Sequence, residues 1–478
     1  MKLIRRFVIA AALTVMQLSA IAQPKSVEEQ LLIKPYVQLG QNASRKGNEL
    51  VIMWHASDND ASWLLETKSD TADKWSSFPV DTVRVETRSI DPYRILSSTL
   101  NKLAAGEKYQ YRVKRNGNVV FESFLTTPKP AGAPFRFVVF GDCGQGTPEQ
   151  KMIANQVYLN SPDLALIPGD IVYNTGLASE YRVKHFPVYN ADRSGPEVGA
   201  PLIRSTLFVA APGNHDILHR AFKKTPDALA YYYYWSQPLN GPLGISGAKN
   251  TPTLDETDSE SDRSAFVSAS GRTYPRMANF SFEFGDAHYL ILDSNPYMDW
   301  SDSALRTWVE KDLSQSTSRW KFVMYHHPGF NSSAKHANDQ WMRLLSPVFE
   351  KCGVDIVFQG HVHNYQRTFP LTFLPEPGDN GNLRAENGSV KGKFTFDKRF
   401  NGTTQTKPNG VMYVISGAGG AELYNSELTT QPDAWQPFTA NYIADTHSFT
   451  VIDLDGGYLQ LRQISKDGKE LDRITITK

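Results

Sequence analysis

Apolar residues follow two different patterns along the chain, and the change between them falls near residue 130. Between residues 33 and 126, short stretches of alternating apolar and polar residues are separated by turn signals such as Asn116-Gly117-Asn118. Alternation over a few residues, without a helical period, is typical of antiparallel strands that bury one face. This part of the chain therefore predicts a small antiparallel β-sandwich.

A proline-rich segment, residues 127–134, follows the predicted sandwich and has the composition of a stiff linker. Beyond it, uninterrupted apolar runs of strand length alternate with helix-like stretches, which predicts βαβ units with helices on both faces. The apolar runs are residues 135–140, 164–167, 207–210, 321–325 and 355–358, and amphipathic helices are expected at 302–316 and 337–351. Short strands at 411–418, 447–454, 458–464 and 471–477 are expected to supply a second sheet packed on the first.

Two segments have the composition of insertions, residues 236–275 and residues 371–409. Long ordered loops often act as lids, so either segment could roof a cleft. An acidic run at residues 255–260 is expected to remain in solvent. The aromatic run at residues 231–235 favours core packing, with the lining of a cleft as the alternative.

The first 22 residues have the features of a secretory signal peptide. Lys2, Arg5 and Arg6 precede an apolar stretch at residues 7–18, and Ala20-Ile21-Ala22 forms a cleavage signal. The apolar stretch is too short to span a bilayer, and an uncleaved anchor is the alternative. We therefore expect a secreted or periplasmic protein with no stable membrane insertion.

The charge balance and the cysteine content exclude several classes of protein. The 478 residues include 50 Lys and Arg against 50 Asp and Glu, and loss of the signal peptide would leave a net charge of −3. Without a basic excess, we expect no nucleic-acid partner. Cys143 and Cys352 exclude a disulfide scaffold or a four-Cys zinc site and are expected to be small, buried or half-buried side chains. The sequence does not indicate the oligomeric state.

Potential metal ligands come directly after the five apolar runs beyond the linker. Because the carboxyl ends of parallel strands meet at one edge of a sheet, we expect these residues to lie together. One such cluster would be ordinary turn or cap chemistry, but five in succession indicate a site. The clusters are Gly141-Asp142-Cys143-Gly144, Gly169-Asp170-Ile171-Val172-Tyr173, Gly213-Asn214-His215-Asp216, His326-His327 and Gly360-His361-Val362-His363.

This series of motifs resembles the metallophosphoesterases, and specifically the purple acid phosphatases, over residues 135–367. The resemblance implies an α/β catalytic domain at residues 135–478, a β-sandwich flanked by helices in four layers and containing βαβ units. Residues 103–113 are similar to the fibronectin-III-like domain that precedes the catalytic domain in that family. This implies an all-β domain of that type at residues 30–127.

The resemblance also implies a binuclear metal centre. The ligands it assigns are Asp142, Tyr173 and His363 for one ion, Asn214, His326 and His361 for the other, and Asp170 as the bridge between them. Most metallophosphoesterases have a histidine where this chain has Gly144, and Tyr173 is expected to supply the missing ligand. A free phenol has a pKa of about 10, so its ionisation favours Fe(III) in the first site. We expect a divalent ion (Zn, Fe or Mn) in the second, and a packed aromatic is the alternative for Tyr173.

The activity implied is that of an exported acid phosphatase acting on small phosphate monoesters. Two cations lower the pKa of a bound water, so that hydroxide attacks phosphorus and inorganic phosphate is released. His215, beside Asn214, and His336, ten residues after His326, are candidates to protonate the leaving group or bind phosphate. For His336 a plain surface position is the alternative.

Tyr365 and Arg367 are expected to brace the last ligands from behind. The sequence is also compatible with two other functions. The same metal site could serve a phosphodiesterase or nucleotide pyrophosphatase, or the chain could be a catalytically inactive binding or adhesion protein.

Overall fold

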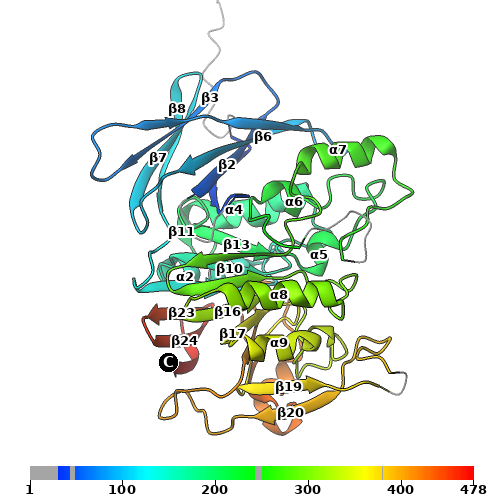
Figure 1. Ribbon diagram of the computed structural model, residues 1–478. Helices are drawn as coiled ribbons and strands as arrows, with labels where there is room; N and C mark the ends of the chain where they lie inside the picture. Colours follow the sequence, from blue (N-terminus) through cyan, green and yellow to red (C-terminus); the bar gives the residue numbers. More distant parts are fainter. Residues whose placement is uncertain (1–30, 43–48, 243–249, 379–380) are drawn as a thin grey trace, which may run out of the picture.

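A computed structural model describes residues 31–42, 49–242, 250–378 and 381–478 (Figure 1). The predicted signal peptide, residues 1–22, lies outside the described residues. Within the described ranges, no helix is both long enough and apolar enough to cross a membrane.

The first eight strands form an all-β unit of two antiparallel four-stranded sheets, as the alternating pattern predicts. Trp54 is buried between these sheets, whereas Val51 and Met53 on the opposite face of the same strand pack against the rest of the chain. The Tyr36 hydroxyl donates to the carbonyl of Tyr234 across that contact, at 2.9 Å. One sheet has the order β1 (Ile33–Gln38), β2 (Glu49–Ser57), β6 (Tyr93–Asn101), β5 (Asp81–Val85), and the other β4 (Ser76–Phe78), β3 (Trp63–Ser69), β7 (Lys108–Arg115), β8 (Asn118–Thr126).

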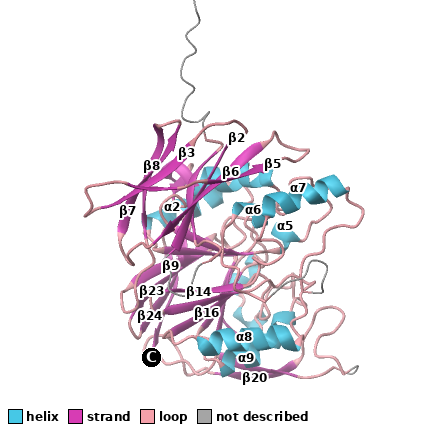
Figure 2. Ribbon diagram, turned by 45° about the horizontal axis from the view of Figure 1, so that its top comes forward, coloured by secondary structure: helices cyan, strands magenta, loops and turns pink. Residues whose placement is uncertain are grey.

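Two larger sheets make up the centre of the remaining chain, and Figure 2 shows α8 and α9 on one side of them. The six-stranded sheet has the order β13 (Leu207–Ala211), β10 (Leu164–Pro168), β9 (Phe135–Val139), β23 (Ser448–Asp455), β24 (Tyr458–Ser465), β25 (Glu470–Thr477). The seven-stranded sheet has the order β14 (Phe280–Phe284), β15 (Ala287–Ile291), β16 (Trp320–Met324), β17 (Ile356–Gln359), β21 (Met412–Ser416), β18 (Tyr365–Thr368), β22 (Thr439–Ile443).

Both faces of the central strands are buried, which explains their uninterrupted apolar runs. Phe137 of β9 points between the two sheets, with its ring 5.3 Å from that of Phe322 and 5.8 Å from that of Phe358. Val138, on the opposite face of the strand, packs in the cluster that contains Ile153 of α2. The result is the predicted helix–sheet–sheet–helix architecture.

The helices begin and end where local chemistry dictates. The Asp302 carboxylate caps α8 by accepting the backbone N–H groups of its first turn, and Leu305, Val309 and Leu313 then form one buried stripe. The helical elements are α2 (Pro148–Leu159), α3 (Ala178–Glu180), η1 (Tyr181–His185), α4 (Phe186–Tyr189), α5 (Asn214–Ile217), α6 (Tyr231–Tyr234), α7 (Glu260–Ser270), α8 (Ser303–Gln315), η2 (Trp341–Leu345), α9 (Ser346–Lys351), η3 (Ser426–Thr430) and η4 (Pro432–Ala434). Two short hairpins, β11 (Asn190–Gly195) with β12 (Gly199–Pro201) and β19 (Leu371–Pro375) with β20 (Gly392–Phe396), complete the fold.

The sheet membership of the C-terminal strands differs from the expectation. Strands β23, β24 and β25 extend the first sheet, because β23 pairs antiparallel with β9 and covers its edge. Of the predicted C-terminal runs, β21 alone joins the second sheet, whose other strands come mainly from the middle of the chain. The difference arises because the apolar period of a segment indicates a strand but does not determine which other strand it pairs with.

Among the described residues of the first insertion, helix α7 packs against the N-terminal unit. Helix α7 contacts β5, and Arg88 pairs with Asp262 at 2.6 Å. The expectation of a solvated acidic run is wrong for Asp258, which is buried and accepts the backbone N–H groups of Phe222 and Lys223. The aromatic run at residues 231–235 is fully buried, which confirms core packing.

Phe137 provides a test of the core between the two large sheets. Truncation to alanine leaves a cavity between rings that cannot fully collapse, so we expect Phe137→Ala to lower the free energy of unfolding by about 3–5 kcal/mol. Urea denaturation followed by tryptophan fluorescence measures the change. Phe124→Ala is the matched control, because this phenylalanine is 45% exposed and its loss should change stability little.

Candidate metal centre

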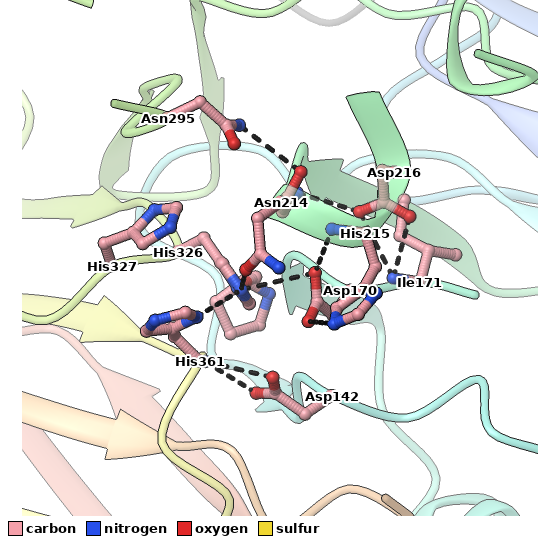
Figure 3. A network of polar contacts seen from close by, with 12 residues as sticks. Asp142, Asp170, Ile171, Asn214, His215, Asp216, Asn295, His326, His327 and His361 are labelled. Atoms are coloured by element: carbon pink, nitrogen blue, oxygen red, sulfur yellow. Dashed lines mark hydrogen bonds and ion pairs between the residues drawn. The ribbon is translucent and has the colours of Figure 1, made fainter. Parts of the chain in front are cut away.

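The ligand motifs of both large sheets meet in one place (Figure 3). Strands β9, β10 and β13 run parallel, and the loops after them carry Asp142, Asp170 and Asn214. Strands β16 and β17 are also parallel and lead to His326 and His361. The sequence-based interpretation treated the five strand ends as one edge, whereas the structure joins the edges of two stacked sheets.

The first group of predicted ligands surrounds the hydroxyl of Tyr173. This hydroxyl lies 3.2 Å from Asp142 Oδ1 and 3.1 Å from His363 Nε2. Ligand atoms of Asp142, Asp170 and His363 lie within 4.8 Å of one another. The buried phenol oxygen is therefore placed among carboxylate and imidazole groups.

The second group surrounds His326 Nε2. This nitrogen lies 3.1 Å from Asn214 Oδ1, 3.2 Å from His361 Nδ1 and 3.3 Å from Asp170 Oδ1. Asp170 therefore belongs to both groups and lies between them, as a bridging carboxylate requires.

Outward hydrogen bonds decide which ring nitrogen faces the centre. The Nδ1–H groups of His326 and His363 donate to the carbonyls of Pro168 and Glu422, at 2.8 and 2.7 Å. In His361 the outward nitrogen is Nε2, which donates to Asp339 Oδ2 at 3.1 Å. Each neutral ring then presents a lone pair inward.

Two ring nitrogens that face each other at such distances need either a shared proton or a metal ion between them, because two lone pairs would repel. The inward nitrogens of His326 and His361 are only 3.2 Å apart, and amide and carboxylate oxygens surround them. Imidazole nitrogen with carboxylate, amide and phenol oxygen is a donor set suited to iron, zinc or manganese. The residues present therefore fit two metal ions.

Burial and neighbouring charges shift the pKa values of the site in different directions: burial acts to lower the pKa of His326, but the carboxylate of Asp170 raises it to about 9. Burial raises the pKa of Asp142 well above its usual range. Burial also acts to raise the pKa of Asp170, but the neighbouring ring of His326 lowers it overall. Burial lowers the pKa of His361 to about 3 and that of His363 to about 4, so both rings stay neutral, as metal ligands must be.

Backbone conformation brings the ligand loops unusually close. Asp142, Asp170 and His361 have φ angles of 55°, 51° and 68°, a left-handed conformation that costs about 1–3 kcal/mol in a residue other than glycine. At Gly213, a Cβ atom would lie 2.2 Å from Asp170 Oδ1. Glycine is therefore required there for the β13 loop to approach the central carboxylate.

His215 and His336, the predicted catalytic histidines, border the two groups. The His215 backbone N–H donates to Asp170 Oδ1 at 3.0 Å, and its ring Nδ1–H donates to the carbonyl of Asn174 at 2.7 Å. The ring of His336 lies 4.0 Å from that of His361, and its Nδ1 is 3.1 Å from Asp339 Oδ2. Both histidines thus leave Nε2 available beside the predicted ligands.

Tyr365 and Arg367 have a different position from the one expected. The Tyr365 hydroxyl donates to Asp472 Oδ2 at 2.7 Å, and Arg367 pairs with the same carboxylate at 2.7 Å. Both side chains therefore anchor β18 to β25 of the other sheet instead of orienting a ligand. A motif places residues next to each other in sequence, but the alternating faces of a strand decide which way their side chains point.

Two carboxylates that organise the site were not predicted. Asp339 accepts hydrogen bonds from both His336 and His361 and fixes their rings. Asp216 accepts the backbone N–H groups of Gly213 and Ile171 and so ties the β13 loop to the β10 loop. The signal for Asp216 was its place in the third motif, and for Asp339 its position three residues after His336.

Cys143 lies beside Asp142 but is turned into the core. Both cysteines are unpaired, Cys143 buried and Cys352 half-buried, as expected from composition. Burial raises the pKa of the Cys143 thiol, so it is a packing residue rather than a thiolate ligand.

The chain is similar to known proteins over the residues that carry the ligand motifs. Residues 135–365 match the family model of the calcineurin-like phosphoesterases. Purple acid phosphatase 18 of Arabidopsis thaliana is 27% identical over 281 residues, which are 58% of this chain and 53% of that protein. The chain thus spans about half the length of this relative. Acid phosphatase type 7 of Mus musculus is 23% identical over 80% of this chain and 76% of its own length.

Among solved structures, the purple acid phosphatase PPD1 from yellow lupin (Lupinus luteus) seeds superposes with a TM-score of 0.63. The match covers 93% of this chain and 74% of the lupin chain at 19% sequence identity. At this identity the likeness concerns the fold, including the all-β unit that precedes the two large sheets.

Asp339 provides a test of the outward hydrogen bonds. Replacing it with alanine frees the ring of His361 to adopt the other tautomer, so we expect Asp339→Ala to lower metal affinity by about 10–100-fold. Competition against a chelator, with the retained metal counted by elemental analysis, measures the loss. Asp433→Ala, in the exposed element η4, is the control and should retain metal like the unaltered protein. Equal retention in both variants would contradict the role given to Asp339.

Proposed function

We propose that this chain, which belongs to the purple acid phosphatase family of calcineurin-like phosphoesterases, is an exported metal-dependent acid phosphatase that hydrolyses small phosphate monoesters. The observation that carries the proposal is the pair of ligand groups that share the buried carboxylate of Asp170. Two ions bound there would activate a water and neutralise charge on the phosphate.

The proposed ligands divide the centre into two sites of different chemistry. Asp142, Tyr173 and His363, with Asp170, offer hard oxygen donors that suit Fe(III). The surroundings raise the pKa of Tyr173 well above its usual value, chiefly through burial, so only a strongly polarising cation would ionise the phenol. Asn214, His326 and His361, with Asp170, offer a neutral oxygen and imidazoles that suit a divalent ion such as Zn, Fe or Mn.

His215 and His336 are assigned to proton donation and phosphate binding. Because His215 Nδ1–H is committed to the carbonyl of Asn174, Nε2 is the atom that can carry a proton to the leaving-group oxygen. His336 likewise donates Nδ1–H to Asp339 and presents Nε2. A protonated imidazole is the form that can donate a proton to the leaving group.

Export is part of the proposal and depends on residues 1–22, whose basic, apolar and small-residue regions have the order of a signal peptide. N-terminal sequencing of the protein recovered outside the producing cell tests it. Processing after Ala22 is the expected result, and an intact N-terminus would contradict it.

Hydrolysis of model esters tests the activity. The metal-loaded protein should release phosphate from p-nitrophenyl phosphate, and Asp170→Ala should lower kcat by on the order of 10³-fold or more, because both ion sites lose a ligand. Asp433→Asn serves as the control for charge. Faster cleavage of bis-p-nitrophenyl phosphate would instead identify a phosphodiesterase, and no phosphate release from any ester would favour a binding protein.

Colour tests the metal assignment. A Tyr173 phenolate on Fe(III) should give a visible charge-transfer band, and Tyr173→Phe should abolish that band while leaving the protein folded. Elemental analysis alongside the spectrum counts iron and the divalent ion. A colourless, fully active protein that holds two zinc or manganese ions would overturn the ferric assignment.

A further inference from the structure

His327, the second histidine of the His326-His327 pair, has no role in the proposed reaction. Its ring lies 5.0 Å from the ring of His326 and 4.3 Å from that of His361, two proposed ligands of the second ion (Figure 3). The side chain is only 2% exposed. A polar ring enclosed this close to the metal centre needs hydrogen-bond partners in its surroundings.

Ser294 decides where the hydrogen of this ring is carried. The Ser294 hydroxyl oxygen accepts the backbone N–H groups of His326 and His327, at 3.1 and 2.8 Å. A hydroxyl oxygen has two lone pairs, and both are then used. The hydroxyl hydrogen is therefore left for His327 Nδ1, which lies 3.0 Å away and accepts it.

This assignment determines the form of the imidazole of His327. A ring whose Nδ1 accepts a hydrogen bond is neutral and carries its hydrogen on Nε2. Within the described part of the chain, Nε2 has no hydrogen-bond partner. The enclosed side-chain atoms that lack a partner there include Asn295 Oδ1 but not His327 Nε2, so this nitrogen is open to solvent. His327 thus presents a neutral donor from a ring that is otherwise enclosed.

Neighbouring groups hold the ring in this orientation. Trp341 packs against His327 with ring centroids 5.2 Å apart, and its indole N–H donates to the carbonyl of Ser294 at 2.8 Å. Ser294 follows β15, which pairs in parallel with β16, the strand that leads to His327. Both ends of the Ser294–His327 hydrogen bond are therefore fixed to the seven-stranded sheet.

We propose that His327 Nε2–H donates a hydrogen bond to a phosphate oxygen of the substrate, which makes His327 a further substrate-binding residue. The proposal rests on the proposed function, because the phosphate has to be held at the ions that His326 and His361 help to bind. The oxygens of a phosphate ester accept hydrogen bonds whatever the leaving group is, so a donor with a fixed hydrogen suits the part that all substrates share. His327 transfers no proton, because Nδ1 is occupied by the Ser294 hydroxyl.

Two amide side chains of different reach test the donor. Glutamine places an N–H group near the position of histidine Nε2, whereas asparagine reaches only the position of Nδ1. We expect His327→Asn to weaken the binding of inorganic phosphate about tenfold, as for one lost hydrogen bond to a charged group, and His327→Gln to preserve it. His327→Phe keeps an aromatic ring without a donor and should match His327→Asn. Titration calorimetry of inorganic phosphate with the metal-loaded protein measures the affinity.

Steady-state kinetics distinguish a substrate contact from a structural effect. Loss of a contact to phosphate should raise KM for p-nitrophenyl phosphate and for phenyl phosphate by the same factor, with kcat little changed. Metal content by elemental analysis should equal that of the unaltered protein. His185→Phe is the control for the loss of a buried histidine, because His185 lies among Phe186, Tyr189 and Trp235, and it should leave phosphate affinity unchanged.

Unchanged phosphate affinity in His327→Asn and His327→Phe would overturn the proposal, as would an equal loss in His327→Gln. A rise of KM confined to one ester, or a loss of metal that accompanies the loss of affinity, would also contradict it. These outcomes differ from a failure of the proposed function, in which the unaltered protein hydrolyses no ester. In that case the calorimetric comparison still decides whether His327 binds phosphate, and no phosphate binding by the unaltered protein would overturn that role.

Discussion

The buried carboxylate of Asp170 is the group on which the arrangement of the site depends. It is only 1% exposed, and its oxygens lie within reach of His326, of the His215 backbone N–H, and of the group that contains Asp142 and His363. A charge removed from water is stable only if its surroundings replace the lost hydration. Ring nitrogens, backbone amides and, as we propose, two cations provide that replacement.

Bringing the ligands around Asp170 requires backbone conformations that are rare in residues other than glycine. Asp142, Asp170 and His361 take left-handed conformations, and Gly213 lies where a side chain would strike the central carboxylate. The strain is tolerated because the loops are short and leave two stacked sheets whose central strands are buried on both faces. Asp216 adds hydrogen bonds from one loop to the next, so the loops hold one another in position.

The two insertions contact different parts of the molecule. Helix α7 of the first insertion packs onto the N-terminal unit, whereas Arg384 of the second insertion lies on the ring of Trp341, which is next to His327. Function of this kind is commonly located in loops, because a rigid framework lets them vary without loss of the core. The proposed chemistry depends on the loops that leave the framework of the two large sheets.

The sequence alone predicted the N-terminal strands, the apolar strands that lead to the site and helix α8, because apolar period is a local property. It did not predict α2, α7 or the strands β14 and β15, and the helix expected at 337–351 is a 3-10 element followed by the short α9. The sequence placed Asp142, Asp170, Asn214 and the histidines at strand ends, which is where the structure brings them together. Only the tertiary structure decided that β23–β25 extend the first sheet, and that Arg367 turns away toward Asp472. It likewise decided that Asp339, far from His361 in sequence, fixes that ring. Sheet partners and side-chain hydrogen bonds between distant segments depend on how the chain closes on itself, and no local pattern encodes that closure.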